Sequence, residues 1–173
     1  MHKHNGFSVS DVARHWTIPD RILNGKPIIL PDTHNICTLT HSEDFARAFL
    51  GLCKNEKAYC EAFHITSGCA YRWSDVASII GEYFGKAAEF AYVPIESIAR
   101  KFHADYGDVY SQLKADKSTS WVFDNSKLLS AVPDFAPTHT LKDGIFQTLE
   151  AMQHADRTSI DARWSELCDE LLK

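Results

Sequence analysis

Short β-forming runs alternate with amphipathic helical stretches along most of this chain, and the alternation narrows the folds open to it. The β-forming runs cover residues 36–41, 62–66, 89–93 and 121–123. Between them, apolar residues recur at spacings of three and four, which is typical of helices that bury one face. The pattern predicts a mixed α/β (α+β) fold.

Several of the expected helices have recognisable ends. Ser42 is expected to cap the helix that follows it, with acidic residues in the first turn, where the helix dipole favours negative charge. Thr140 with Asp143 three residues later has the spacing of a capping box. The helix after Ser42 is expected to bury a stripe made of Phe45, Ala48, Phe49, Leu52 and Cys53.

The chain divides into three expected segments. Residues 1–20 form a weakly patterned lead-in anchored by Trp16 and Ile18, and residues 21–155 form the α/β domain. Residues 156–173 form a C-terminal amphipathic helix with Ile160, Trp164, Leu167 and Leu171 on one face. That face either packs on its own domain or docks on another protein, and the sequence leaves both alternatives open.

Charge and hydropathy exclude several classes of partner. There are 18 basic and 23 acidic residues, with a formal net charge of −5 and no long run of either sign, which disfavours nucleic acid. No stretch approaches the roughly 20 apolar residues of a membrane span, and the first residues lack the apolar core of a secretory signal. The simplest expectation is a cytoplasmic protein without a membrane partner.

The five cysteines have irregular spacings and include no Cys-x-x-Cys pair. An odd number without paired spacing indicates neither a disulfide framework nor a zinc knuckle, so we expect reduced and mostly buried thiols. Two mixed clusters have weak ligand character: His34, Cys37 and His41, and Cys60, His64 and Cys69. No metal is expected.

The eight glycines are too scattered to form a phosphate-binding loop. A dinucleotide site needs a glycine-rich turn that opens a helix, so that the backbone approaches the pyrophosphate, and no three glycines have that spacing. Tyr110 and Lys114 form a Tyr-x-x-x-Lys pair with Ser97 upstream, a spacing suited to proton transfer. Without a cofactor-binding loop, however, there is no bound cofactor with which the pair could act in catalysis. We therefore expect no cofactor bound by this chain alone, and assign no catalytic residue.

Polar residues near strand ends are the candidates for ligand contact. His41 follows a predicted strand, on the side where α/β proteins gather ligands. Lys117, Asn125 and Lys127 flank the predicted strand at 121–123, where they could hold a diphosphate or a sugar. The alternative is that Asp124 or Asn125 caps a helix and both lysines are solvated.

Five segments, read in order, carry a likeness to a known family. They are RILNGKP at 21–27, THSEDFARAF at 40–49, AFHITS at 62–67, VFDNSK at 122–127 and VPDF at 132–135. Together they resemble the C-terminal half of NAD-dependent epimerase/dehydratase proteins, the extended branch of the short-chain dehydrogenase/reductase superfamily. The likeness runs from about Arg21 to about Met152.

The resemblance implies a small substrate-binding lobe that lacks the Rossmann domain, which in this family binds NAD(P) and carries the catalytic Ser/Thr, Tyr and Lys. It implies a nucleotide-sugar substrate, no turnover by this chain alone, and a Rossmann domain in trans or a homo-oligomer as partner. Arg72 departs from the family, where a capping Ser or Thr is more usual before the next helix. The candidate substrate-binding residues are Arg21, His41, Lys117, Asn125 and Lys127.

Overall fold

The computed structural model describes residues 16–173, so most of the expected lead-in segment lies outside the described residues. The strands are β1 (Ile28–Pro31), β2 (Cys37–Thr38), β3 (Ala70–Tyr71) and β4 (Phe90–Val93). The helices are α2 (Thr17–Leu23), α3 (Ser42–Cys53), α4 (Trp73–Tyr83), α5 (Ile95–Tyr106), α6 (Val109–Lys117), α7 (Ser126–Ala131), α8 (Leu141–His154) and α9 (Ala162–Leu171), with a 3-10 turn η1 (Glu56–Ala58).

The strands form two small sheets. β1 and β4 pair in parallel with Ile28 opposite Phe90, while β2 and β3 pair antiparallel with Cys37 opposite Tyr71. The mixed α/β prediction is therefore confirmed, and so is the strand at 89–93. The strand predicted at 62–66 is wrong, because this β-forming segment has no neighbouring strand to pair with among the described residues. The strand predicted at 121–123 is reduced to one bridge between Trp121 and Cys37.

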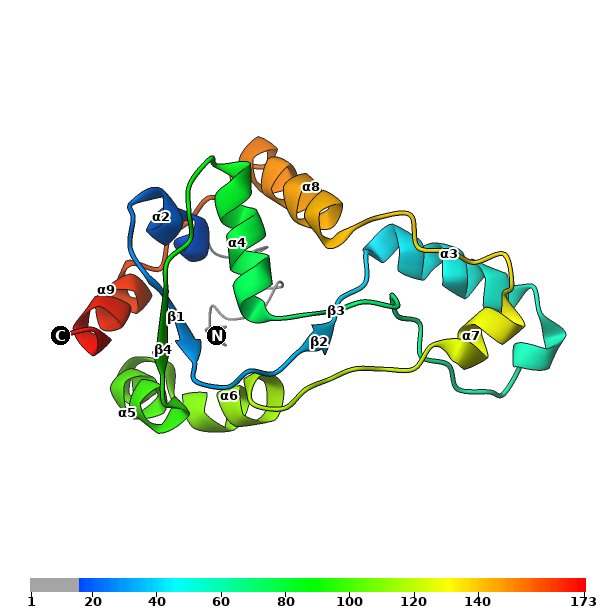
Figure 1. Ribbon diagram of the computed structural model, residues 1–173, viewed down its shortest axis with the longest axis horizontal. Coiled ribbons are helices and arrows are strands. Elements are labelled where there is room, and N and C mark those ends of the chain that lie inside the picture. The colour runs from blue at the N-terminus through cyan, green and yellow to red at the C-terminus, as the bar shows by residue number, and fades with distance from the viewer. Residues whose placement is uncertain (1–15) are drawn as a thin grey trace.

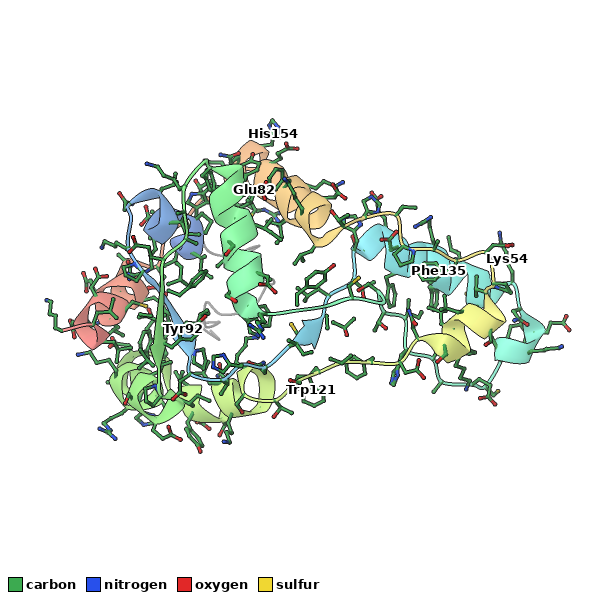
Figure 2. All side chains as sticks on the ribbon, viewed as in Figure 1. Lys54, Glu82, Tyr92, Trp121, Phe135 and His154 are labelled. Carbon is green, nitrogen blue, oxygen red and sulfur yellow. The ribbon has the colours of Figure 1, made fainter. Side chains whose placement is uncertain are left out.

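Figure 1 shows a broad part, here called the body, and a narrower extension, here called the arm. The body consists of the β1–β4 pair with α2, α4, α5, α6, α8 and α9, and the arm consists of α3, η1 and α7. Two apolar clusters lie in the body, one around Ile29 and Phe102 and the other around Ile80 and Leu149. A third, smaller cluster gathers in the arm around Phe135, which is labelled in Figure 2.

The predicted buried stripe of α3 is only half correct. Ala48 and Leu52 are buried in the arm cluster, as expected. Phe45 and Phe49, however, are 46% and 51% exposed, and Cys53 is exposed as well. The described part of the arm offers α3 only a short helix and a few loop side chains to pack against, so one side of its apolar surface stays in solvent.

The N-caps of α3 and α8 can be compared with the caps predicted from the sequence. The predicted Ser42 cap is wrong: His41 is the N-cap of α3, and its Nδ1 accepts the Glu43 backbone N–H at 3.3 Å. The predicted capping box at Thr140 and Asp143 is confirmed at the start of α8. A histidine cap brings an imidazole to the position where a hydroxyl was expected.

α9 packs on its own chain. Trp164 and Leu167 are 4% and 1% exposed within the cluster of Ile29 and Phe102, whereas Ile160 is 47% exposed. Most of the amphipathic face is therefore taken up by the chain's own core.

All five cysteines are free, as predicted, but the predicted burial is wrong for three of them. Cys37 and Cys168 are buried, but Cys53, Cys60 and Cys69 are exposed. Among the described residues, no helix has the length and apolar content needed to cross a bilayer.

Candidate functional site

Two pockets stand out among the described residues. The larger pocket has a volume of about 550 Å³ and lies where α3 and α8 begin, beside β3. Three segments line it, and they combine hydroxyl and imidazole groups with apolar side chains that include Leu39, Leu141 and Ile145. These segments contribute Thr40, His41 and Ser42; Ser67, Gly68, Cys69 and Tyr71; and Pro137, Thr138, His139, Thr140, Gly144 and Thr148. A volume of this size is in the range of small-molecule sites.

His41 projects from the start of α3 and is held on three sides. Its Nδ1 accepts the Glu43 N–H, so Nε2 carries the proton and donates to Gln147 Oε1 at 2.9 Å. Its ring stacks on that of His139, with centroids 3.9 Å apart and planes 17° apart. Gly144 permits this packing, because a Cβ added there would lie 3.1 Å from His41 Cδ2.

Asp44 anchors one wall of the larger pocket. This carboxylate is 1% exposed and accepts the backbone N–H groups of Thr138 and His139, each at 3.1 Å, together with the Arg47 guanidinium. Burial acts to raise the pKa of Asp44, but the hydrogen bonds from Thr138, Arg47 and His139 outweigh it and hold that pKa well below its ordinary value. An ionised buried carboxylate thus fixes the segment before α8 against α3.

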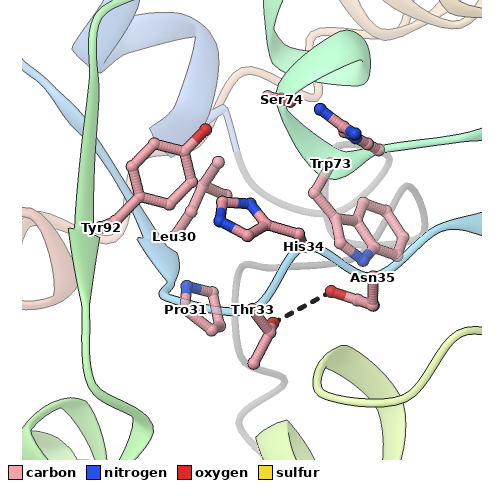
Figure 3. A pocket seen from close by; sticks show the side chains of 9 residues that line it. Leu30, Pro31, Thr33, His34, Asn35, Trp73, Ser74 and Tyr92 are labelled. Atoms are coloured by element: carbon pink, nitrogen blue, oxygen red, sulfur yellow. Dashed lines mark hydrogen bonds between the residues drawn. The ribbon is translucent and has the colours of Figure 1, made fainter.

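A smaller pocket of about 130 Å³ opens at the carboxyl ends of β1 and β4 (Figure 3). Figure 3 shows His34 between Tyr92 and Trp73, and the rings of His34 and Tyr92 have centroids 6.1 Å apart. Arg72, the unusual residue before α4, also lines it and provides no side-chain cap for that helix. The volume is below the roughly 300 Å³ at which small-molecule pockets usually begin.

The structure places the five predicted substrate residues in separate regions. His41 lines the larger pocket. Lys117 is buried behind the smaller one, with its Nζ 4.1 Å from the centroid of the Trp73 ring. Asn125 and Lys127 lie in the arm, and Arg21 lies in the body.

The residues outside the pockets have structural contacts. Arg21 is 2% exposed and donates to the Pro27 carbonyl, to Ser165 and to Asp169. Asn125 Nδ2 donates to the Thr66 carbonyl at 3.0 Å. Lys127 pairs with Glu61 at 2.6 Å, and it also donates to the Ala62 carbonyl. These three side chains therefore hold segments of the chain together.

The other chemical patterns of the sequence do not converge on a pocket. Tyr110 is 41% exposed on α6, and neither it nor Lys114 nor Ser97 lines either pocket. Within residues 16–173, the His/Cys/Asp/Glu side chains that come close enough to share a metal are His41, Glu43 and His139. The two metal clusters considered from spacing alone are not brought together.

His139 is the site residue that sequence reasoning missed. The signal available was the capping box at Thr140, which places residue 139 at the start of α8. Its contact with His41, however, spans almost a hundred residues of sequence and arises from tertiary packing.

Comparison with solved structures shows a fold likeness to sugar epimerases. An epimerase from Methanothermobacter thermautotrophicus matches with a TM-score of 0.58 and 19% identity, over 81% of this chain and 38% of that one. UDP-glucuronic acid 4-epimerase from Bacillus cereus, in complex with NAD, gives 0.56 and 17%, over 81% and 39%. UDP-glucose 4-epimerase from Thermotoga maritima, with UDP-glucose, gives 0.54 and 20%, over 80% and 38%.

These matches cover the C-terminal part of the neighbouring chains, and the chain spans less than half of their length. At identities of 17–20% the likeness establishes the fold, and at that level the resemblance drawn from five sequence segments is confirmed. No protein-family model and no curated protein matches the sequence.

Proposed function

We propose that this chain is the substrate-binding, C-terminal part of an NAD(P)-dependent epimerase or dehydratase that acts on a nucleotide sugar. The observation that carries the proposal is the fold likeness to UDP-sugar 4-epimerases over four-fifths of the chain. The larger pocket supports it, since a volume of about 550 Å³, with hydroxyl and imidazole groups among apolar side chains, is in the range of small-molecule sites.

The nicotinamide cofactor is expected to come from elsewhere. The chain has no glycine-rich phosphate loop, and Tyr110 with Lys114 lies away from both pockets. A Rossmann domain, in the same protein or in a second one, would supply the cofactor and the catalytic residues. Turnover by the described residues alone is not expected.

The exposed face of α3 is where we place that Rossmann domain. Phe45, Phe49 and Leu50 are 46%, 51% and 58% exposed, which is a large apolar area for one short helix. Residues 62–66 in the same arm have strand-forming composition and no strand partner among the described residues. A Rossmann domain whose β-sheet covered α3 and paired with residues 62–66 would bury the exposed apolar side chains and give this segment a strand partner.

The α3 proposal is tested with the double variant Phe45→Ser/Phe49→Ser. Because these rings add little to the chain's own core, we expect its free energy of unfolding to change by less than about 1 kcal/mol, while its association with a Rossmann domain added in trans, measured by calorimetry, falls. Ala48→Phe is the matched control on the buried face and should destabilise the arm. A large loss of stability in the double variant would show that the face is already occupied.

Ligand binding is tested by isothermal titration of the chain with UDP-glucose, UDP-glucuronic acid and NAD. At least one UDP-sugar should bind, and NAD should not bind tightly. Gly144→Ala should weaken sugar binding, because the new Cβ displaces His41, whereas Glu150→Ala, at an exposed position of the same helix outside both pockets, should not. Tight NAD binding together with no sugar binding would refute the proposal.

The alternative, an interaction module that docks through the C-terminal helix, finds no support in the packing. Trp164 and Leu167 of its apolar face are buried against α5 and β1. No observation favours this alternative over the substrate-binding role.

A further inference from the structure

We propose that His41, Glu43 and His139 form a zinc site on the wall of the larger pocket. One ligand atom from each of the three lies within 4.8 Å of the other two. Two imidazoles and one carboxylate are a common protein ligand set for Zn²⁺ when a fourth position is left to water or substrate.

His139 and Glu43 already have the spacing of two ligands on one ion. His139 Nε2 lies 3.3 Å from Glu43 Oε2. Two ligand atoms that each bind zinc at about 2.1 Å in a tetrahedral shell lie about 3.4 Å apart. A cation of this size therefore fits between the two atoms with little movement.

The neighbouring carboxylate of Asp44 fixes which nitrogen of His139 is free. Nδ1 lies 3.2 Å from Asp44 Oδ1, a distance at which its N–H can donate to the carboxylate oxygen. Nε2 then faces Glu43 and is the nitrogen available to a cation. A histidine that donates to a carboxylate through its other nitrogen is the usual arrangement of a zinc ligand.

His41 completes the shell by turning. Its ring is stacked almost parallel to that of His139, and lone pairs of parallel stacked rings point side by side rather than at one ion. Rotation of the His41 side chain releases its bonds to Gln147 and to the Glu43 N–H, the second of which is long at 3.3 Å. His41 lines the 550 Å³ pocket, which leaves open space beside the ring for this movement.

The local charge favours a cation. The N-terminal ends of helices α3 and α8 both lie at this cluster, and the dipoles of the two helices alone would favour an anion. Asp44 accepts the His139 N–H just before α8, Asp143 accepts the Thr140 N–H at the start of α8, and Glu43 adds a third carboxylate. Arg47 is the cation paired with Asp44, so acidic groups remain in excess around the three ligands.

The site would keep one open position toward the larger pocket, since both His41 and His139 line that pocket. An oxygen atom of a bound ligand, or a water molecule, would occupy it. This inference does not depend on the nucleotide-sugar proposal, because zinc binding can be measured without any sugar.

The test is titration of the chain with ZnCl₂ by calorimetry, supported by visible absorption of the Co²⁺ form. Exposed Cys53, Cys60 and Cys69 can bind zinc nonspecifically, so the titrations use a variant with all three changed to Ser. We expect one zinc per chain in that variant. Absence of zinc binding in that variant would overturn the proposal.

In the same triple Cys→Ser variant, Glu43→Gln and His139→Ala should each weaken zinc binding by about 10-fold or more. The Glu43 side chain is 69% exposed, so the Glu43→Gln variant is expected to fold normally. It therefore still tests the site if the His139→Ala variant fails to fold. His34→Ala and Glu82→Gln, which change a histidine and a glutamate outside the cluster, should bind zinc unchanged. Unchanged binding in Glu43→Gln, or equal losses in the control variants, would contradict the site.

Discussion

Asp44 is the single residue on which the arm and the segment before α8 most depend. Its buried carboxylate accepts the N–H groups of Thr138 and His139 and pairs with Arg47. Asp44→Ala should lower the free energy of unfolding by about 3 kcal/mol, because the backbone N–H groups of Thr138 and His139 lose their buried acceptor and Arg47 loses its partner. Urea unfolding measures it, and exposed Asp134→Ala should change stability by less than about 0.5 kcal/mol.

Asp169 links stability to acid pH. Burial acts to raise the pKa of Asp169, but hydrogen bonds from Lys26 and Arg21 outweigh it and lower that pKa below the ordinary value. A carboxyl with a lowered folded-state pKa stabilises the fold above its unfolded pKa of about 4, and this contribution is lost as the pH falls through the folded-state value.

Asp169→Asn should therefore remove part of the acid dependence. We expect thermal melting of the variant to fall less steeply than that of the parent chain between about pH 5 and pH 2. Asp134→Asn, at an exposed carboxylate that does not pair with Arg21, serves as the comparison. Identical pH slopes for Asp169→Asn and the parent chain would contradict the role given to the Arg21–Asp169 pair.

At the scale of elements, α9 is the helix whose role the structure changes most. Its apolar face was open to either of two uses, and Trp164 fills a space beside Phe102 and Tyr106, with ring centroids 4.2 Å and 5.1 Å away. Trp164→Ala should cost about 3–5 kcal/mol, as for large core aromatics. Calorimetric melting is the readout, with Ile160→Ala as the exposed control. A near-neutral Trp164→Ala would return α9 to a docking role.

α3 shows how the same kind of periodicity can produce a face that is only partly buried. Its apolar residues have helical spacing, but the arm covers Ala48 and Leu52 and leaves Phe45 and Phe49 exposed. Spacing predicts which residues share a face, whereas coverage depends on what lies opposite. That is why the α3 face, and not the α9 face, carries the proposed domain contact.

At the scale of the whole molecule, thiol accessibility tests the packing. Burial raises the pKa of Cys168 to about 12, and Cys37 is also buried, so neither should react in the folded chain. We expect about three thiols to react with a disulfide reagent under native conditions and about five after denaturation. Fast reaction of Cys168, identified by peptide mapping, would contradict the position of α9.

The sequence by itself determined the elements that depend on local physics. Helix periodicity and the Thr140–Asp143 capping box rest on contacts between residues close in sequence, and the structure confirms them. The absence of a glycine-rich loop is likewise a property of the sequence. The ordered likeness to epimerases also needed no coordinates, because five segments in a fixed order are a sequence pattern.

Only the tertiary structure decided which polar groups meet. The sequence predicted His41 as a ligand contact. Its stacking on His139 and the burial of Asp44, however, arise because the beginnings of α3 and α8 lie against each other. Residues 62–66 have the composition of a strand and stay unpaired, since a strand exists only where another strand lies beside it. Composition sets what a segment can form, and the neighbours brought by folding decide whether it does.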